Sequence, residues 1–380
     1  MSGLSVVTLG CRLNHAESAR LAVALGGHRD TVLVNTCAVT AQAVRQSRRA
    51  IRHARNRGMR VIATGCAATI DPKGFGALAD ELILNVDKPD GATAPIHDRV
   101  HTRAFVPVQN GCDHSCTFCI IPQGRGPSRS RPVDDVIAEV AALAEAGVAE
   151  VVLTGVDLTS YASPNLGTLV EAILTKVPAL HRLRLSSLDG VEIDPLLFEL
   201  ITGEQRVMPH VHLSLQSGDD LVLKRMKRRH LRGDAIALVE RLKAARPGIA
   251  IGADIIAGFP TESPEAHARN LSLIEECDIV HGHVFPYSPR PGTPAARMPQ
   301  VDPVMVRERA AELRSAVAAR RERWLATKAG AVEPVLAEQD GTGHAPDFAR
   351  FRLPAGTRPG SIVMLRAGGV CDDLLVGEAA

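Results

Sequence analysis

Residues 110–126 read NGCDHSCTFCIIPQGRG, and the three cysteines in this stretch decide the fold of the central part of the chain. Cys112, Cys116 and Cys119 are spaced as C-x3-C-x2-C. A four-iron cluster has four iron corners and cysteine thiolate is its usual protein ligand, so three thiolates leave one iron open for a substrate or cofactor. Zinc sites usually present two pairs of ligands, and no second pair follows nearby, although His114 lies inside the loop. The spacing therefore favours an iron–sulfur cluster.

Six apolar stretches in the central part of the chain predict strands, and helical patterns separate them. The strands are expected at residues 104–109, 150–155, 182–187, 210–216, 249–258 and 279–287. Strands that alternate with helices form parallel sheets, so six such units predict a parallel barrel or partial barrel. The active site of such a barrel lies at the C-terminal ends of its strands, and the cysteine loop follows the first of them.

A second set of three cysteines lies near the N-terminus. Cys11, Cys37 and Cys66 each follow an apolar stretch that predicts a strand, at residues 4–10, 31–36 and 60–65. With helical patterns between them, these stretches predict an α/β domain with a parallel sheet. Because the carboxyl ends of parallel strands meet at one edge, we expect the three thiols to converge there and to hold a second four-iron cluster. One such cysteine alone would more often be a small buried side chain than a ligand.

The C-terminal part of the chain predicts a long helix followed by short strands. Residues 302–328 form the helix, with seven Lys and Arg against four Asp and Glu, or 7 − 4 = +3. From about residue 331, short strands and Gly/Pro turns predict a small antiparallel β-barrel, whose charge is 4 − 7 = −3. We therefore expect an α/β protein with three domains, at residues 1–98, 99–330 and 331–380.

Composition narrows the classes of protein. No apolar run approaches the roughly 18 residues that span a bilayer, and no basic region precedes the first apolar stretch, so we expect no membrane contact, no signal peptide and a cytoplasmic location. In that compartment cysteines are more often metal-binding or catalytic than disulfide-bonded. The net charge of +2 argues neither for nor against an anionic partner. The aromatic content of 3% argues against broad base-stacking surfaces.

Nine stretches of the chain resemble the radical S-adenosylmethionine (SAM) methylthiotransferases, in the same order as in that family. Besides the cysteine loop, which continues to Pro132, they are TLGCRLNHAES, VNTCAVT, TGCAA, TGVDLTSY, RLRLSSLDG, HLSLQSGDDLVLKRMKRRH, GADIIAGFPTES and HVFPYSPRPGTPAARMPQ. Together they span most of residues 5–300. The VNTCAVT, MKRRH and HVFPYSPRPGTPAARMPQ stretches look most like the branch that modifies threonylcarbamoyladenosine at position 37 of tRNA.

The resemblance implies a radical mechanism with two four-iron clusters and SAM as cofactors. The cluster on the C-x3-C-x2-C cysteines would bind SAM and generate a radical, and the cluster on the dispersed cysteines would hold sulfur on its open iron. One SAM would methylate that sulfur, and a second would yield the radical that abstracts hydrogen from C2 of the adenine. The implied partners are tRNA, a reducing protein of the flavodoxin or ferredoxin type, and a sulfur donor that no motif identifies.

The same resemblance suggests residues that contact SAM. Phe118 would pack on the adenine, although it could equally be a loop hydrophobe. Three residues at the end of the second barrel strand lie where related enzymes contact the amino group of SAM: Gly155, Val156 and Asp157. Ser187 and Gln216 also end predicted barrel strands and are expected to face the cofactor. All six are therefore candidate cofactor-binding residues.

The resemblance also extends to the tail, which is similar to the small RNA-binding barrel of this family, the TRAM domain. Its acidic charge speaks against a phosphate-binding role, which requires a basic surface. Arginines of the predicted long helix, the basic run at residues 224–229 and the arginines at residues 125–131 are the other candidates for phosphate contact, or else solvated surface.

Three alternatives remain at this point. The same chemistry could act on isopentenyl-adenosine at position 37 of tRNA, or on an aspartate of a ribosomal protein, which the acidic tail keeps open. From a different class, a non-catalytic RNA-binding protein stabilised by zinc would use the cysteines structurally.

Overall fold

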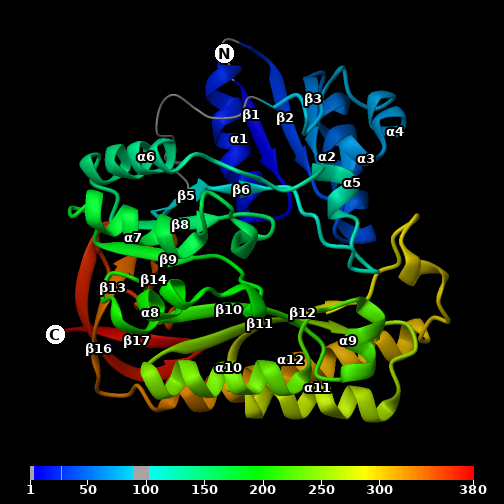
Figure 1. The fold of residues 1–380 in the computed structure, drawn as a ribbon. Helices are drawn as coiled ribbons and strands as arrows, with labels where there is room; N and C mark the ends of the chain where they lie inside the picture. Colours follow the sequence, from blue (N-terminus) through cyan, green and yellow to red (C-terminus); the bar gives the residue numbers. More distant parts are fainter. Residues whose placement is uncertain (1–3, 27, 89–101) are drawn as a thin grey trace.

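The computed structural model describes residues 4–26, 28–88 and 102–380, and the predicted domain boundary between residues 98 and 99 lies outside them. An N-terminal parallel sheet, a central half-barrel and a small closed barrel follow one another along the chain (Figure 1). The predicted α/β fold class is thus confirmed. None of the helices in the described ranges combines the length and apolarity needed to cross a bilayer.

The N-terminal unit is a four-stranded parallel sheet in which the strand order equals the chain order. Leu21 of the first helix packs with Leu33 of β2 on one face, whereas Ile51 and Phe75 pack with Val34 on the other. Neighbouring residues of β2 thus face different layers, which is why this strand is buried along its whole length. The elements are β1 (Ser5–Thr8), α1 (Arg12–Ala24), β2 (Thr31–Thr36), α2 (Ala41–Asn56), β3 (Arg60–Gly65), α3 (Cys66–Ile70), α4 (Pro72–Gly76) and β4 (Glu81–Ile83).

The central unit has six parallel strands arranged as two three-stranded sheets, β5-β8-β9 and β10-β11-β12, which isolated bridges join at Leu183–Val207 and Leu188–Leu213. The predicted partial barrel is therefore present. Its strands are β5 (Ala104–Pro107), β8 (Glu150–Thr154), β9 (Arg182–Leu185), β10 (His210–Gln216), β11 (Ala250–Ala257) and β12 (Ile279–Pro286). Its helices are α5 (Ile121–Arg125), α6 (Val133–Glu145), α7 (Leu166–Lys176), α8 (Pro195–Gly203), α9 (Asp220–Met226), α10 (Arg232–Ala245), α11 (Pro264–Glu276) and α12 (Pro303–Ala326).

The first predicted barrel strand is interrupted in the structure. β5 ends at Pro107, and the following residues form β6 (Gln109–Asn110), which pairs antiparallel with β7 (Arg129–Ser130). The cysteine loop connects the two strands of this short hairpin, and their pairing closes the base of the loop. The loop therefore leaves the sheet at the carboxyl end of β5, where a barrel places its active site.

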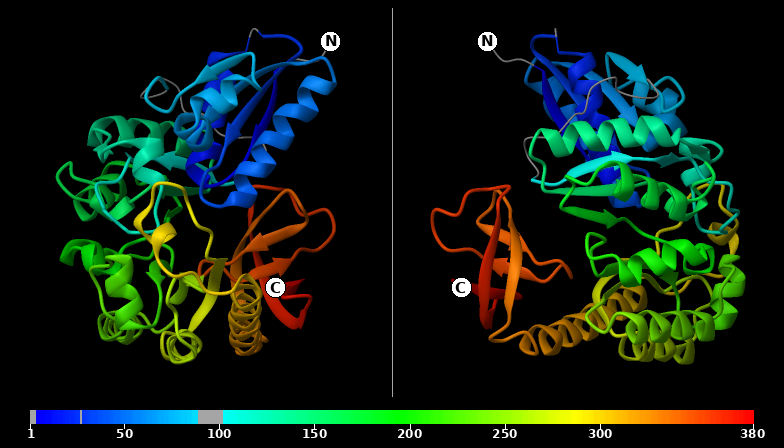
Figure 2. Two further views of the ribbon diagram at one scale, coloured as in Figure 1. Left: turned by 90° about the vertical axis from the view of Figure 1, so that its right-hand side faces the viewer. Right: turned by 60° about the vertical axis from the view of Figure 1, so that its left-hand side comes forward.

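The C-terminal unit is a closed barrel of five strands in the order β13-β14-β15-β17-β16. Its strands are β13 (Val332–Ala337), β14 (Thr342–His344), β15 (Arg350–Arg352), β16 (Ile362–Cys371) and β17 (Leu374–Ala379). It follows α12 and lies beside the starts of the central strands (Figure 2). Phe348, at φ 73°, stacks on His210 with ring centroids 5.0 Å apart, and the Arg184 guanidinium lies 4.7 Å from its ring. The small barrel thus covers the amino end of the half-barrel, opposite the cysteine loop.

Candidate active site between the N-terminal sheet and the half-barrel

The three dispersed cysteines follow successive strands of the N-terminal sheet. Cys37 and Cys66 come directly after β2 and β3, and Cys11 lies just beyond β1. Since these strands are parallel neighbours, their carboxyl ends bring the three residues to one edge. A Cβ atom built on Gly10 would lie 3.0 Å from the Cys37 sulfur, which shows how closely the first loop approaches the second. The structure therefore brings together the residues that the pattern predicted would converge.

Gly65 shows why this edge requires a glycine. Its φ of 94° lies in the left-handed region, and a Cβ there would lie 2.3 Å from the Asn35 amide oxygen and 2.4 Å from the carbonyl oxygen of Thr36. Only glycine accepts both the backbone angle and the close approach. The glycine turns the chain sharply from β3 into α3, so that Cys66 opens the helix at the sheet edge.

Two of the three thiols at this edge, Cys37 and Cys66, are buried, whereas Cys11 is exposed. Burial raises the pKa of Cys37 to about 11, and the neighbouring Cys66 and Cys11 sulfurs contribute further. Arg290, from the loop after β12, is 8% exposed, donates to the Ala38 carbonyl at 3.2 Å and adds a positive charge beside Cys37. A thiol of this kind is protonated at neutral pH unless a metal displaces its proton.

The tight cysteine set occupies the loop at the carboxyl end of β5. Burial raises the pKa of Cys112 to about 12, and Asp157 and the other two cysteines of the set add to the shift. The backbone N–H groups of His114 and Ile121 point at the sulfurs of Cys112 and Cys119, both at 3.4 Å. Hydrogen bonds of this type tune the potential of iron–sulfur clusters.

Arg125 joins the two cysteine sets. It ends α5, a few residues beyond Cys119, and its side chain is 2% exposed. Its Nε donates to the Cys66 sulfur at 3.2 Å, and its other nitrogens donate to Glu17 at 2.7 Å and to Asn14 at 2.5 Å. Burial opposes its charge, but the Cys66 sulfur and Glu17 outweigh it and raise the pKa of Arg125. A residue of the half-barrel loop therefore bonds directly to a cysteine of the N-terminal sheet.

Arg125 was a candidate for surface or phosphate contact from the sequence, and the structure corrects this. Its carboxylate partner is 108 residues away, and the flanking residues are both glycines, so no local pattern indicates burial. Glu17 also pairs with Lys88, and the two cations hold the pKa of this buried carboxyl below its usual value despite its burial. Sequence reasoning missed this interdomain charge network entirely.

The backbone and apolar contacts around Arg125 bring the two cysteine sets close. Asn85 donates to the Gly124 carbonyl at 2.6 Å and to the Cys66 sulfur at 3.7 Å. Ile120 packs in the apolar core of the N-terminal sheet, and a Cβ on Gly124 would lie 3.2 Å from the Cys66 Cβ. Burial raises the pKa of Cys119 to about 11, and the Cys66 sulfur contributes to that shift. The two sets thus face each other across the interface, where α3 and α5 lie side by side (Figure 1).

Both donor sets fit iron–sulfur clusters. Each offers three thiols, and each is bordered by N–H groups that point at sulfur. Several buried polar atoms lack a hydrogen-bond partner among the described residues, as expected where a bound group would supply it. They are Asn35 Oδ1 and Asn85 Oδ1 beside the dispersed set, and Ser186 Oγ, Asp189 Oδ1 and Arg228 Nε at the carboxyl ends of the barrel strands.

Three of the residues predicted to contact SAM lie in the turn after β8. Gln109, which the sequence did not indicate, holds this turn in place. The Gln109 side-chain oxygen accepts from the N–H groups of Val156 and Asp157, at 3.0 and 2.9 Å. A Cβ on Gly155 would lie 2.9 Å from the same oxygen. The Asp157 carboxylate contacts His114 at 2.6 Å. This turn therefore offers a ligand its carbonyl oxygens and a carboxylate rather than free N–H groups.

The other predicted SAM contacts lie around the same barrel end. Ser187 follows β9, and Gln216 ends β10 with a φ of 66° beside an irregularity in strand pairing. A non-glycine residue in the left-handed region at a strand end is strained, and such strain is typical of functional positions. Phe118 packs edge-on against Phe259, with ring centroids 6.3 Å apart, and is partly buried in a small apolar cluster.

The basic run at residues 224–229 is partly turned inward. Arg228 is buried, donates to Asp189 at 3.0 Å and lies 3.8 Å from the Cys116 sulfur. Arg229 pairs with Asp189 at 3.1 Å and with Glu192 at 2.8 Å. Burial opposes ionisation of Asp189, but these two arginines outweigh it and lower its pKa. Two of the arginines in this run are therefore committed to the site itself.

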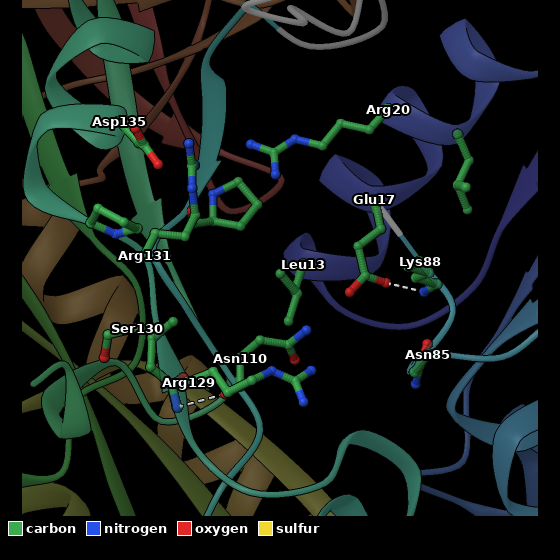
Figure 3. Close-up of a pocket in the computed structure, with 14 residues that line it drawn as sticks. Leu13, Glu17, Arg20, Asn85, Lys88, Asn110, Arg129, Ser130, Arg131 and Asp135 are labelled. Atoms are coloured by element: carbon green, nitrogen blue, oxygen red, sulfur yellow. Dashed lines mark hydrogen bonds and ion pairs between the residues drawn. The ribbon is translucent and has the colours of Figure 1, made fainter. Parts of the chain in front are cut away.

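A cavity of about 330 Å³ lies between α1 and β7, beside Glu17 (Figure 3). Arg20 and Arg131 line it, and both pair with Glu139, at 2.9 and 2.6 Å. Its basic lining is therefore largely neutralised within the protein. Arg129, on the exposed strand β7, is the lining arginine that forms no ion pair with any residue in the described ranges.

Comparisons with known proteins place both cysteine sets within known families. Residues 106–274 match the Radical SAM superfamily, and residues 4–84 match a group described as Uncharacterized protein family UPF0004. The radical-SAM methyltransferase TsrM from Kitasatospora setae, solved with cobalamin and a [4Fe-4S] cluster bound, has a TM-score of 0.57 at 16% identity, covering 78% of this chain and 77% of that chain. At that identity the likeness supports the fold alone.

Curated relatives match over almost the whole chain. The threonylcarbamoyladenosine tRNA methylthiotransferase MtaB of Rickettsia prowazekii (strain Madrid E) is 43% identical over 92% of this chain and 90% of the relative. The protein of the same name from Chlamydia pneumoniae is 32% identical, over 98% and 97%. The tRNA-2-methylthio-N(6)-dimethylallyladenosine synthase of Ruegeria sp. (strain TM1040) is 34% identical over 84% of each chain.

Proposed function

Since this chain belongs to the radical-SAM tRNA methylthiotransferases, we propose that it adds a methylthio group to C2 of N6-threonylcarbamoyladenosine at position 37 of tRNA. The cofactors of this enzyme class are two four-iron clusters and SAM. Membership also sets aside the non-catalytic zinc protein that the cysteines alone left open. We further propose a cytoplasmic location and a reducing partner of the flavodoxin or ferredoxin type.

The observation that carries the proposal is the approach of the two cysteine sets across one interface. Methylthiolation needs both a radical source and a sulfur source at one substrate atom, so the two centres must lie close together. Arg125 bonds to Cys66 from the loop that carries Cys119, and the two sulfurs are near enough to affect each other electrostatically. We propose Cys112, Cys116 and Cys119 as ligands of one cluster, and Cys11, Cys37 and Cys66 as ligands of the other.

The residues of the chain have distinct tasks in this proposal. When bound, the clusters and SAM supply the radical and the sulfur chemistry. Gln109 fixes the turn at residues 155–157, whose carbonyl oxygens and Asp157 carboxylate would hold the amino group of SAM. Asp189 and Arg228 hold the barrel end in place beside Cys116. Phe118, Ser187 and Gln216 remain proposed SAM contacts at the same rim.

The choice of substrate rests on the relatives' names and on their sequence identity. The relative that is 43% identical over 92% of this chain carries the threonylcarbamoyladenosine name. Two relatives named for dimethylallyladenosine, one 34% identical over 84% of each chain and one 32% identical over 96% of this chain and 92% of the relative, keep isopentenyl-type adenosine as the second candidate. An aspartate of a ribosomal protein is the third, because the C-terminal barrel has a charge of 4 − 7 = −3.

Mass spectrometry of tRNA nucleosides separates these candidates. We expect a strain lacking the gene to lose the methylthio mark on threonylcarbamoyladenosine only, and the wild-type gene to restore it. A gene encoding Cys37→Ala should not restore it, whereas Cys277→Ala, a buried cysteine outside both sets, should. An intact mark in the deletion strain would exclude the proposed substrate, and loss of the mark on dimethylallyladenosine would identify the second candidate instead.

A further inference from the structure

The outer face of α2 is the most uniformly basic surface of the N-terminal unit. Residues 41–60 contain seven arginines and no Asp, Glu or Lys. Ser47, Ile51 and Ala54 form the buried side of the helix. Arg45, Arg49 and Arg52 follow one another at spacings of four and three residues, so they share the opposite side and span about 10 Å. We call these three residues the arginine face.

The arginine face has no charge partner among the residues that the structure describes. Of the other arginines in this segment, Arg48 pairs with Asp71, and Arg55 and Arg60 pair with acids of the following strand region. The guanidinium groups of the arginine face are exposed and form no ion pair or hydrogen bond with any residue in the described ranges. An unpaired row of arginines repels itself, so its retention at the surface is best explained by an external anion.

Other basic segments of the chain are largely used internally. On α12, four of six arginines pair with acids in the described part of the chain. They are Arg309, Arg320, Arg321 and Arg323. The basic run before α10 commits two arginines to Asp189, and two of the three cavity arginines share Glu139. The C-terminal barrel is acidic, at 4 − 7 = −3. The long helix and the basic run were both candidates for phosphate contact in the sequence, and these pairs leave fewer of their arginines available for it.

The arginine face is also well placed relative to the cysteines. α2 begins four residues after Cys37, with Thr40 as its N-cap. The Ser288 hydroxyl, from the loop after β12, accepts from the N–H of Ala41 at 3.1 Å. The helix therefore runs outward from the edge where the dispersed cysteines meet the half-barrel, as the view in Figure 1 shows. A polyanion whose reacting base lies at that edge would pass along α2.

We propose that the arginine face binds the phosphate backbone of the tRNA strand beside the modified nucleotide. This inference rests on the proposed function, which supplies a large RNA as the substrate. Arginine suits the role because its planar guanidinium donates two hydrogen bonds to one phosphate and stays charged. An acidic electron-transfer protein is the competing occupant, but RNA is favoured because the face lies beside the substrate-reacting edge and is built of arginine alone.

The test compares two matched double variants of the anaerobically reconstituted enzyme. R49Q/R52Q removes two charges from the arginine face, and R307Q/R314Q removes two exposed arginines of α12 that also lack ion pairs among the described residues. The affinity for unmodified tRNA is measured across a series of salt concentrations. Each lost phosphate contact lowers the slope of log affinity against log salt by about one, so R49Q/R52Q should lower it by about two. R307Q/R314Q should match the wild type.

The outcomes separate this inference from the proposed function. Equal salt slopes for the wild type and R49Q/R52Q would overturn the inference, because the wild type still binds tRNA. Slower reduction by a flavodoxin-type donor with an unchanged tRNA slope would also overturn it and assign the face to that protein. A wild-type enzyme that shows no salt-dependent tRNA affinity would contradict the proposed tRNA substrate itself. Iron content and unfolding temperature, which should equal those of the wild type, verify that both variants are folded and loaded.

Discussion

Replacing Arg125 by methionine should loosen the contact between the N-terminal sheet and the half-barrel. Arg125 is 2% exposed and Glu17 is 9% exposed, so the substitution leaves a buried carboxylate that has lost its 2.7 Å partner. Breaking a buried ion pair from one side costs about 3–5 kcal/mol. Lys88 still pairs with Glu17, so we expect the low end, about 3 kcal/mol. The entropy of unfolding of a 380-residue chain is about 0.8 kcal/mol per K, so this corresponds to a fall of about 4 °C in unfolding temperature.

The assay is thermal unfolding of the cluster-free protein, with Arg20→Met as the matched control. Arg20 also bridges the two units through Glu139, but its side chain is 14% exposed and Glu139 keeps Arg131. We expect this control to cost about 1 kcal/mol or less. An Arg125→Met protein that unfolds within 1 °C of the wild type (about 0.8 kcal/mol or less), or no earlier than the control, would refute the reasoning.

The same substitution should change the second cluster in the reconstituted enzyme. Arg125 donates from Nε to the Cys66 sulfur, and both the positive charge and the N–H···S bond favour the reduced state. The reduction potential assigned to the cluster on the dispersed cysteines should therefore fall in Arg125→Met, while that of the other cluster changes less. A redox titration followed by electron paramagnetic resonance measures both, and an equal shift at both clusters would contradict this assignment.

Three further predictions concern the half-barrel and its C-terminal cover. Glu150→Gln should cost about 3–5 kcal/mol in denaturant unfolding, because it leaves the fully buried Arg184, now 2.7 Å from the carboxylate, without a counter-charge; a cost below about 1 kcal/mol would contradict this. Phe348→Ala should cost about 3–5 kcal/mol, and Phe348→Gly about 1 kcal/mol less, since glycine relieves the φ of 73°; equal stabilities would show that the backbone is unstrained. Burial, and after it the charge of Arg321, lowers the pKa of His281 to about 3. The stability that the neutral imidazole contributes to the fold is therefore complete above about pH 6.5 and is lost as the pH falls. In His281→Phe, the pH slope of unfolding free energy between pH 6.5 and 5.5 should be smaller by about 1 kcal/mol per pH unit, and an unchanged slope would count against the lowered pKa of this imidazole.

The fold followed from the sequence wherever strands were long enough to show a pattern. β2 is buried throughout and β11 nearly so because both are covered on two faces, and their lengths distinguish them from helices. The strands missed in the two smaller units, β4 and β14, have three residues each. Such stretches carry no periodicity, and pairing with a neighbouring strand decides their conformation.

The candidate site was predictable where the order of strands along the chain determines the positions of its residues. Cys37 and Cys66 follow neighbouring parallel strands, so topology alone brings them together. The charges that join the two units were not predictable, because Arg125 and Glu17 are 108 residues apart and neither has a local signature. Gln109 was also missed, since its role as an acceptor for two N–H groups depends on how β5 and β8 pair.

The charge of a segment proved a poor guide to its surface. The long helix and α2 both looked basic in sequence, but acids from α11 and its end, Glu275 and Asp278, neutralise arginines of the long helix. No comparable acids reach the outer side of α2 among the described residues. Which arginines remain free is therefore a property of tertiary packing rather than of composition.

The central claim is that two facing cysteine sets hold two clusters, and counting iron and sulfide tests it most directly. The measurement is made on anaerobically reconstituted wild-type protein and on the triple variant Cys11→Ala/Cys37→Ala/Cys66→Ala. We predict about eight iron and eight sulfide per wild-type chain, and about four of each in the variant. About four in both proteins would leave the dispersed cysteines structural and contradict the proposed sulfur-transfer site.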